Sequence, residues 1–354
     1  MTIDIDTSRP VLVTGATGYV AGRLVERLLA EGLTVHAAVR DPGRKEKLAH
    51  LDEAAARLPG TIRYFAADLM QPGSNTEAMA GCQVVFHTAS PFVLGVNDPQ
   101  KDLVDPAVNG TRSVLESANA VESVQRVVLT SSCAAIYGDN VELNDVPGGI
   151  FTEEHWNTTS SLDHNPYPYS KVMAEKAAWE IAEAQSRWDL VVINPSFVIG
   201  PGLSPFGTSE SFKVVQQMGN GMMLAGAPKL GMGAVDVRNL AEAHFRAGFT
   251  PGASGRYIAS GHNTDFVEMA QTLRPRFDKY PLPKGPLPKW LMKLIGPITN
   301  KGVTRRYVEL NVNHPLRVDN AKSRRELGMD YRPLAESMND FFQQLIDSGQ
   351  LKAR

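Results

Sequence analysis

The sequence predicts an α/β fold with a doubly wound parallel sheet and a smaller C-terminal lobe. Three observations predict it. Short apolar segments alternate with helical segments through the first half, these segments are apolar enough to be buried on both faces, and the regularity falls after Pro195. Strands buried on both faces belong to parallel sheets that helices cover, and the alternating order is typical of doubly wound folds. A length of 354 residues suits two domains, or one large domain with an added lobe.

Short runs rich in β-branched residues predict the strands of the first half. They lie at residues 11–14, 34–39, 62–66, 84–87, 127–130 and 190–193. Helical periodicity follows the first strand over residues 20–31, where Val20, Leu24 and Leu28 share one side and charged residues the other. Strands and helices in this order predict a Rossmann-type domain over residues 1–195.

The second half of the chain is less regular. Glycine and proline cluster at residues 200–207, 219–233 and 281–288. Residues 196–354 are therefore expected to form mainly the second lobe. Residues 255–260 resemble another strand, which we expect to return to the sheet, and residues 334–348 are predicted to form the last helix.

Composition excludes several classes of protein. A net charge of −2 implies no general basic face, so we expect no nucleic-acid partner. No run of 18 uncharged apolar residues is present, and residues 290–298 are predicted to form a packed surface helix or lid rather than a membrane anchor. Two scattered cysteines, Cys82 and Cys133, form no disulfide framework and favour a reducing cytoplasm. The eight histidines lack metal-binding spacing, so we expect no metal.

A glycine-rich turn lies between the first strand and the first helix, in the sequence Thr14-Gly-Ala-Thr-Gly-Tyr-Val-Ala-Gly22. Gly15 permits a tight turn, and Gly18 lets the backbone approach a pyrophosphate. The N-terminus of the helix then offers free N–H groups and its positive dipole end to that phosphate. Because the strand before and the helix after both match, the turn predicts a dinucleotide site.

The residue at the end of the second strand predicts which dinucleotide binds. An acidic residue there would accept hydrogen bonds from the ribose hydroxyl of NAD, but the sequence has Arg40. The planar guanidinium can stack on adenine and pair with a 2′-phosphate. Arg44, Lys45 and Lys47 follow and could add positive charge, or could form only a solvated basic loop. We therefore expect NADP rather than NAD.

Two further segments lie where the cofactor should run. Asp68 follows the third strand and could accept a hydrogen bond from the adenine amino group. Thr88 follows the fourth strand, at the carboxyl edge where ligands bind in open sheets. Each segment could instead be only a loop, but the position favours a cofactor contact.

A tyrosine and a lysine are predicted to form the centre of a catalytic site. Tyr167 and Lys171 are four residues apart in a strongly helical segment, so they share a face of that helix. A free phenol has a pKa of about 10, and a nearby ammonium group favours its ionised form. Such a pair can exchange protons at neutral pH. The spacing alone is not specific, since Tyr280 and Lys284 repeat it.

A hydroxyl at the end of the fifth strand strengthens this prediction. The apolar run at 127–130 is followed by Ser131 and Ser132. Ser132 is expected in the crevice, where it can donate to a carbonyl oxygen as negative charge develops there. Ser131 and Thr130 are the alternatives for this role.

Several motifs together carry a family resemblance. They are TGATGYVA at 14–21, AVRDP at 38–42, ADL at 67–69, VFHTASPF at 85–92, LTSS at 129–132, YPYSK at 167–171 and NPSFVIGP at 194–201. The chain resembles the extended short-chain dehydrogenases/reductases, in particular the group of dihydroflavonol, cinnamoyl-CoA and yeast-type methylglyoxal reductases. The motifs run in the order of that family from residue 11 to about residue 250. The last hundred residues resemble the family only in their general sequence character.

The resemblance implies NADPH-dependent reduction of an aldehyde or ketone to an alcohol, in a reversible reaction. Tyr167 would donate the proton, Ser132 would orient the carbonyl, and Lys171 would favour the ionised tyrosine. The implied cofactor contacts are Gly15, Thr17, Gly18, Tyr19, Val20, Arg40, Lys47, Asp68, Leu69, Thr88, Tyr167, Lys171, Pro195, Val198 and Ser211. Asn109 would hold a structural water near Lys171 or pack within a helix. The apolar side chains that could line the substrate pocket are Phe92, Val93, Leu94, Tyr137, Phe197 and Phe206.

Departures from the family pattern leave other functions open. The cinnamoyl-CoA reductases carry Asn-Trp-Tyr-Cys-Tyr where this chain has Asn165-Pro-Tyr-Pro-Tyr169, which weakens a CoA-ester substrate. A 3β-hydroxysteroid dehydrogenase stays possible. Arg40 argues against a nucleotide-sugar epimerase or dehydratase, which mostly bind NAD. A non-catalytic NADP sensor would lose the tyrosine or lysine, and this chain keeps both. The resemblance suggests a monomer or homodimer acting on a small carbonyl or alcohol.

Overall fold

The computed structural model describes residues 6–90, 96–207, 209–299 and 302–352. Within these ranges, seven parallel strands form the main sheet in the order β3-β2-β1-β4-β5-β6-β9. Their bounds are β1 Val11–Thr14, β2 Thr34–Val39, β3 Thr61–Ala66, β4 Val84–His87, β5 Arg126–Thr130, β6 Asp189–Pro195 and β9 Gly255–Ala259. The predicted doubly wound parallel sheet is thus confirmed. The strand order reverses between β1 and β4, which makes this the point where ligands bind in such sheets.

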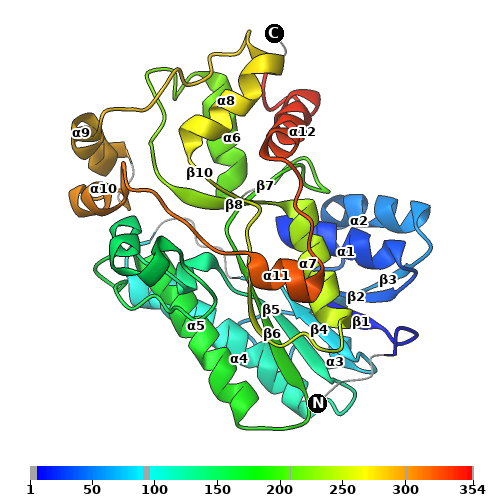
Figure 1. Cartoon of the computed structure of the whole chain (residues 1–354). Helices are drawn as coiled ribbons and strands as arrows, with labels where there is room; N and C mark the ends of the chain where they lie inside the picture. Colours follow the sequence, from blue (N-terminus) through cyan, green and yellow to red (C-terminus); the bar gives the residue numbers. More distant parts are fainter. Residues whose placement is uncertain (1–5, 91–95, 208, 300–301, 353–354) are drawn as a thin grey trace.

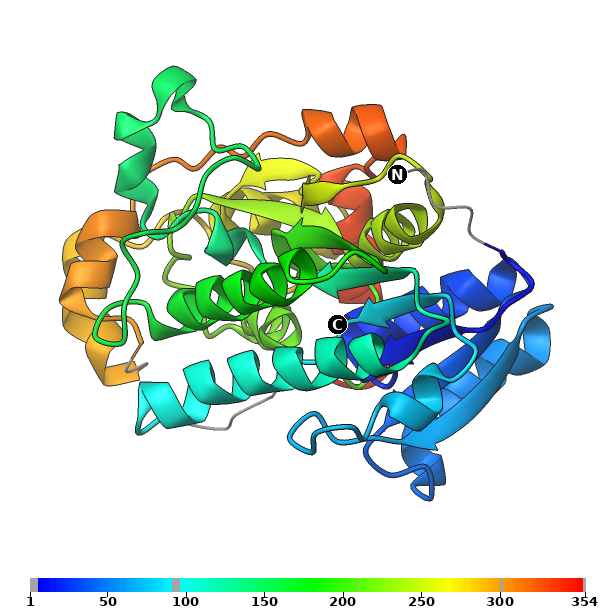
Figure 2. The ribbon, with the colours of Figure 1, turned by 90° about the horizontal axis from the view of Figure 1, so that it is seen from below.

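Helices cover both faces of the sheet (Figure 1). One face carries α1 (Tyr19–Ala30), α2 (Lys45–Arg57), α7 (Val237–Phe249) and α11 (Ala321–Leu327), whose apolar residues form one core with the strands. The other face carries α3 (Thr76–Met79), α4 (Asp105–Ala120) and α5 (Pro166–Glu183). Figure 2 shows α4 and α5 running side by side along this face. The stripe Val20, Leu24 and Leu28 of α1 faces the core as its periodicity predicts.

The edge strand β3 differs from the prediction that the strands are apolar on both faces. Thr61, Arg63 and Ala66 are exposed, while the residues between them are partly buried. The physical reason is position. β3 pairs only with β2 at one edge of the sheet, and its side chains reach the neighbouring cores only in part, whereas the opposite edge strand β9 is buried.

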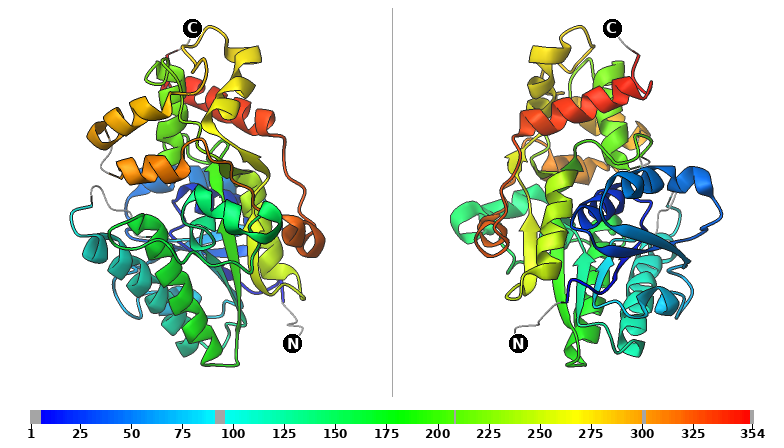
Figure 3. Two further views of the ribbon diagram at one scale, coloured as in Figure 1. Left: turned by 60° about the vertical axis from the view of Figure 1, so that its left-hand side comes forward. Right: turned by 90° about the vertical axis from the view of Figure 1, so that its right-hand side faces the viewer.

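A second lobe lies beyond the carboxyl ends of the main strands (Figures 1 and 3). Its small sheet has the order β10-β8-β7, formed by β7 (Phe197–Ile199), β8 (Met232–Asp236) and β10 (His262–Thr264). Three helices pack on these strands around a separate apolar core: α6 (Glu210–Asn220), α8 (Phe266–Phe277) and α12 (Leu334–Asp347). The chain crosses to this lobe after β6 and returns through α7 and β9, so the lobe is continuous with the main sheet.

Short helical segments connect these elements. They are η1 (Gln100–Val104), η2 (Cys133–Ala135), η3 (Asn140–Asp145) and η4 (Pro147–Gly149). Near the C-terminal end, α9 (Lys289–Thr299) packs against α10 (Arg305–Asn311) through Met292. The predicted helix at 290–298 is present, but Trp290 is 66% exposed. In the described part of the chain, no helix is long and apolar enough to cross a membrane.

Candidate active site

The glycine turn lies at the reversal point of the sheet. Gly15 follows β1 with a φ of +63°, a conformation that side-chain-bearing residues rarely adopt. A Cβ at this position would lie 2.9 Å from the Cβ of Ala89, which follows β4. Glycine is therefore required at position 15 for two reasons, the positive φ of the backbone and the close approach of Ala89.

The N-terminus of α1 is suited to bind an anion. Gly18 is the N-cap residue in an extended conformation, and no side chain caps the helix. Thr17 and Gly18 are exposed. The backbone N–H groups of the first turn and the helix dipole are thus directed at the space beside Gly15. This arrangement fits the diphosphate of a dinucleotide.

Arg40 and Lys47 lie beside this turn, at the next strand. Arg40 directly follows β2, which pairs with β1, and Lys47 lies in the first turn of α2. Both side chains are exposed. Arg44, between them, is paired with Glu46 at 3.0 Å. Two cations therefore stand at the end of β2, as an adenosine 2′-phosphate would require.

The two other predicted loop contacts also lie at the carboxyl edge. The Asp68 carboxylate accepts from the Met70 N–H at 2.9 Å, so it organises its own turn after β3. Thr88 donates its hydroxyl to the carbonyl of Thr14 at 2.6 Å and ties the end of β4 to the end of β1. Leu69 packs on the core below.

Further predicted contacts lie where the lobe meets the sheet. The Tyr19 hydroxyl donates to the carbonyl of Gly200 at 2.5 Å, and its ring packs edge-on against Phe212. Burial raises the pKa of Tyr19 well above its usual value. Its side chain thus enters the lobe core, and its backbone N–H belongs to the anion-binding turn. The remaining residues predicted to contact the cofactor are Val20 on α1, Pro195 at the end of β6, Val198 on β7 and Ser211 on α6.

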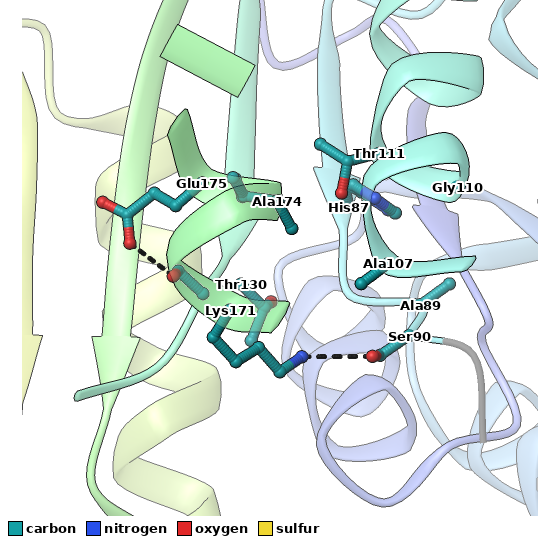
Figure 4. Close-up of a pocket in the computed structure, with 12 residues that line it drawn as sticks. His87, Ala89, Ser90, Ala107, Gly110, Thr111, Thr130, Lys171, Ala174 and Glu175 are labelled. Atoms are coloured by element: carbon teal, nitrogen blue, oxygen red, sulfur yellow. Dashed lines mark hydrogen bonds between the residues drawn. The ribbon is translucent and has the colours of Figure 1, made fainter. Parts of the chain in front are cut away.

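Helix α5 carries the predicted tyrosine and lysine. Proline at its first position favours helix initiation. Tyr167, in the first turn, is 53% exposed. The Lys171 ammonium lies 5.5 Å from the centre of the Tyr167 ring and donates to the Ser90 hydroxyl at 3.1 Å (Figure 4). The lysine therefore reaches from α5 to the end of β4.

Three hydroxyl groups lie at the end of β5, and they differ in their hydrogen-bond partners. Thr130 pairs with the buried His244 Nε2 at 2.7 Å, and Ser131 donates to the buried Glu175 carboxylate. The Ser132 Oγ accepts from the Ala134 N–H at 3.1 Å. Among the described contacts, Ser132 alone of the three keeps its hydroxyl proton to donate. This supports the assignment of Ser132 over the two alternatives.

A buried ion pair between Glu175 and Arg256, which sequence reasoning missed, lies next to this site. Glu175 is 1% exposed and pairs with Arg256 of β9 at 2.6 Å. Besides Ser131, its carboxylate accepts from Asn194 at 2.9 Å. Glu175 lies one helical turn beyond Lys171, so the i+4 spacing was an available signal. No local pattern marked Arg256, and Asn194 was recognised only as the first residue of the NPSFVIGP motif, with no role assigned to it.

A small cavity of about 20 Å³ lies between α4, α5 and the ends of β4 and β5 (Figure 4). Polar residues His87, Thr111 and Lys171 are among those that line it, and its size suits one water molecule. Burial, with a smaller effect of Lys171, lowers the pKa of His87 to about 3, so this imidazole is neutral. Asn109 is exposed and is not among the lining residues. The alternative of a buried packing role for Asn109 was therefore wrong, and its water-binding role stays a prediction.

The structure describes three of the six apolar residues suggested for the pocket, and each has different surroundings. Phe92, Val93 and Leu94 lie outside the described residues. Tyr137 stacks on Phe151, and Phe197 packs edge-on against Phe266. The remaining one, Phe206, is exposed.

The two cysteines are buried free thiols. Burial raises the pKa of Cys82 to about 12 and that of Cys133 further. Both are therefore protonated at neutral pH. Among the described residues, no group of three His, Cys, Asp or Glu side chains could hold a metal ion.

Comparison with known proteins identifies the family. The model of the NAD dependent epimerase/dehydratase family matches residues 11–254. Cinnamoyl-CoA reductase CAD2 of Medicago truncatula is 38% identical over 281 residues, which cover 77% of this chain and 82% of the relative. Tetraketide alpha-pyrone reductase 1 of Arabidopsis thaliana is 34% identical over 350 residues, with 96% of each chain covered. The structure of yeast methylglyoxal/isovaleraldehyde reductase Gre2 complexed with NADPH is similar with a TM-score of 0.75 and 29% identity, covering 97% of this chain and 100% of that one. The chain therefore belongs to the NAD dependent epimerase/dehydratase family, among the extended short-chain dehydrogenases/reductases that its motifs predicted.

Proposed function

We propose that this protein reduces an aldehyde or ketone to the corresponding alcohol with NADPH. The protein is an oxidoreductase, as are the reductases to which it is similar. Its cofactor is NADP, and the similar structure of Gre2 contains NADPH. The exposed cations Arg40 and Lys47 beside the glycine turn support NADP over NAD.

One observation carries the proposed chemistry. Lys171 places its ammonium group 5.5 Å from the ring of the exposed Tyr167 and also reaches Ser90 at the carboxyl edge of the sheet. The same edge holds Ser132, whose hydroxyl keeps a proton to donate. A carbonyl group held between Ser132 and Tyr167 would meet both a hydrogen-bond donor and an acid.

Each residue then has a role in the reaction. When bound, NADPH supplies the hydride that the carbonyl carbon receives. Tyr167 gives its hydroxyl proton to the carbonyl oxygen, and Ser132 stabilises the charge on that oxygen by a hydrogen bond. Lys171 stabilises the tyrosine once it has lost its proton. Run backwards, the same groups oxidise an alcohol, so the reaction is reversible.

The organisation of the chain is part of the same proposal. We infer that residues 1–195, completed by β9, hold NADP and that residues 196–354 mainly bind the substrate. The presence of a separate apolar core around α6, α8 and α12 supports this division. We further propose that the protein acts in the cytoplasm as a monomer or homodimer on a small carbonyl or alcohol.

The first experiment is an assay of NADPH oxidation with aldehydes, aryl ketones, α-keto esters and 3-ketosteroids. Tyr167→Phe is expected to lower kcat on the best substrate by about 10²- to 10⁴-fold, the usual contribution of a general acid. Tyr169→Phe is the matched control, because residues two apart on a helix face different directions. It should keep nearly full activity. Turnover that survives Tyr167→Phe would reject the proposed chemistry.

A further inference from the structure

We propose that Asp139 is a positioning residue that sets the place of Tyr167 through Asn165 and links it to the second lobe. This inference rests on the proposed role of Tyr167 in proton transfer. Asp139 precedes η3 and is 3% exposed. Nothing in the proposed reaction itself requires a carboxylate at this position.

The Asp139 carboxylate is the common acceptor of three side chains. Its Oδ1 accepts from the amides of Asn165 at 3.0 Å and Asn311 at 2.5 Å. Its Oδ2 pairs with His164 Nε2 at 2.6 Å. A carboxylate offers enough lone pairs for all three donors, and burial makes each bond costly to lose. These contacts join η3, the start of α5 and the end of α10.

Asn165 is the residue through which Asp139 reaches the tyrosine. Its φ of 56° lies in the left-handed region, which is unfavourable for a residue with a side chain. A residue that precedes proline is normally extended, and Asn165 precedes Pro166. Its carbonyl accepts the N–H of Tyr169, the first hydrogen bond of α5. The conformation of Asn165 therefore directs the first turn, which carries Tyr167, and the bond to Asp139 holds that conformation.

Asn311 connects the same carboxylate to the second lobe. It is the last residue of α10, and its side-chain oxygen accepts from the Asn140 N–H at 2.9 Å. The Asn140 amide in turn donates to the carbonyl of Gly231 at 2.7 Å. The lobe proposed to bind substrate and the turn that carries Tyr167 thus share one anchor. We infer that docking of this lobe and placement of the proton donor are coupled.

A comparison of substitutions at residue 165 tests this without removing the buried carboxylate. Asn165→Ala loses the bond to Asp139 and keeps the unfavourable left-handed backbone. It should lower kcat by about tenfold to a hundredfold, as small misplacements of a reacting group do. Asn165→Gly also loses the bond but adopts the left-handed region freely, so it should restore kcat to within about threefold of the unchanged protein. Affinity for NADPH, measured by its fluorescence, should be equal in both variants.

A double-mutant cycle tests the role of Asp139 itself. Asp139→Ala removes both acceptor oxygens, so it should lower kcat by a larger factor when Asn165 is present than in a protein that already carries Asn165→Gly. Glu142→Gln is the matched control, because Glu142 accepts from the Asp139 N–H at 2.7 Å and does not act on its carboxylate. Equal losses of kcat in both backgrounds, or equal activity of Asn165→Ala and Asn165→Gly, would overturn the inference. Retained turnover in Tyr167→Phe would instead reject the proposed function.

Discussion

At the scale of single residues, Arg40 determines the choice of cofactor in our proposal. It is exposed at the end of β2, where its planar guanidinium can pair with a 2′-phosphate that NAD lacks. Arg40→Ala should raise the KM for NADPH by about tenfold or more, the usual loss for a charged hydrogen bond, and raise the KM for NADH less, because NADH can lose only the stacking on adenine. Arg44→Ala is the control, since Arg44 is already paired with Glu46. Steady-state kinetics with both cofactors decide the matter, and equal effects on NADPH and NADH would contradict the role of Arg40.

Glu175 matters for stability at the same scale. Glu175→Gln keeps the shape of the side chain but leaves the Arg256 guanidinium buried without its counter-charge. The free energy of unfolding should fall by about 3–5 kcal/mol. Glu180→Gln on the same helix breaks only an exposed pair with Arg112 and should cost less than about 1 kcal/mol. Urea unfolding at neutral pH measures both, and equal losses would show that the buried pair contributes nothing special.

Contacts between residues close in sequence could be predicted, whereas contacts between residues far apart in sequence could not. Tyr167 and Lys171 could be predicted because one helical turn joins them, and Ser132 because it ends a strongly apolar strand. The bond between Glu175 and Arg256 joins residues 81 positions apart. The pairing of β9 with β6 and the packing of α5 on the sheet bring them together, so no local pattern could reveal the bond.

At the scale of elements, most strands could be predicted from apolar runs, since burial on both faces leaves a strong signal. Residues 11–14, 34–39 and 84–87 match β1, β2 and β4 in full. The exposed edge strand β3 gives a weaker signal, because its side chains are only partly buried against the cores on the two faces of the sheet. The short helices η2 and η3 have no periodicity to detect and follow from caps and side-chain contacts instead.

The turn between β1 and α1 gives a prediction at this scale. Gly15→Ala would place a methyl group 2.9 Å from Ala89 and also strain a φ of +63°. Gly32, after α1, has a φ of +77° but open space around it, so Gly32→Ala carries the backbone strain alone. Gly32→Ala should cost about 1–2 kcal/mol of unfolding free energy and leave NADPH binding unchanged. Gly15→Ala should cost more and weaken NADPH binding, as fluorescence titration would show. Equal behaviour of the two variants would mean that the contact with Ala89 is not tight in solution.

At the scale of the whole molecule, the sheet and the lobe meet along the carboxyl ends of the strands (Figure 1). Tyr19 enters the lobe core from α1, while the uncapped N-terminus of this helix lies at the predicted cofactor-binding turn. Asp139 joins α5 to α10 in the same way from the other side. Contacts of Tyr19 and Asp139 therefore join the two parts of the chain, and the geometry of the candidate site depends on how these parts pack together.

Two buried histidines, His87 and His244, are expected to make the free energy of unfolding of the protein depend on pH. Burial lowers the pKa of His87 to about 3 and that of His244 to about 4, from a usual value near 6.5. His244 is fixed as a neutral ring, since Nδ1 must donate to the Leu240 carbonyl at 2.8 Å and Nε2 then accepts from Thr130 at 2.7 Å. In the folded protein neither ring takes up a proton at mildly acidic pH, whereas both do so in the unfolded chain.

The sign of the effect follows from this difference in bound protons. Below about pH 6.5 the unfolded chain binds protons that the folded protein excludes, so the free energy of unfolding falls as the pH falls. Each histidine contributes about 1.4 kcal/mol per pH unit between about pH 6 and pH 4, and nothing above about pH 7.5. Urea unfolding across this range measures the slope. Replacing both rings, by His87→Gln and His244→Gln together, should lower the stability at neutral pH but flatten the acid slope. If the doubly substituted protein keeps the full slope, other groups carry the pH dependence and these two histidines do not.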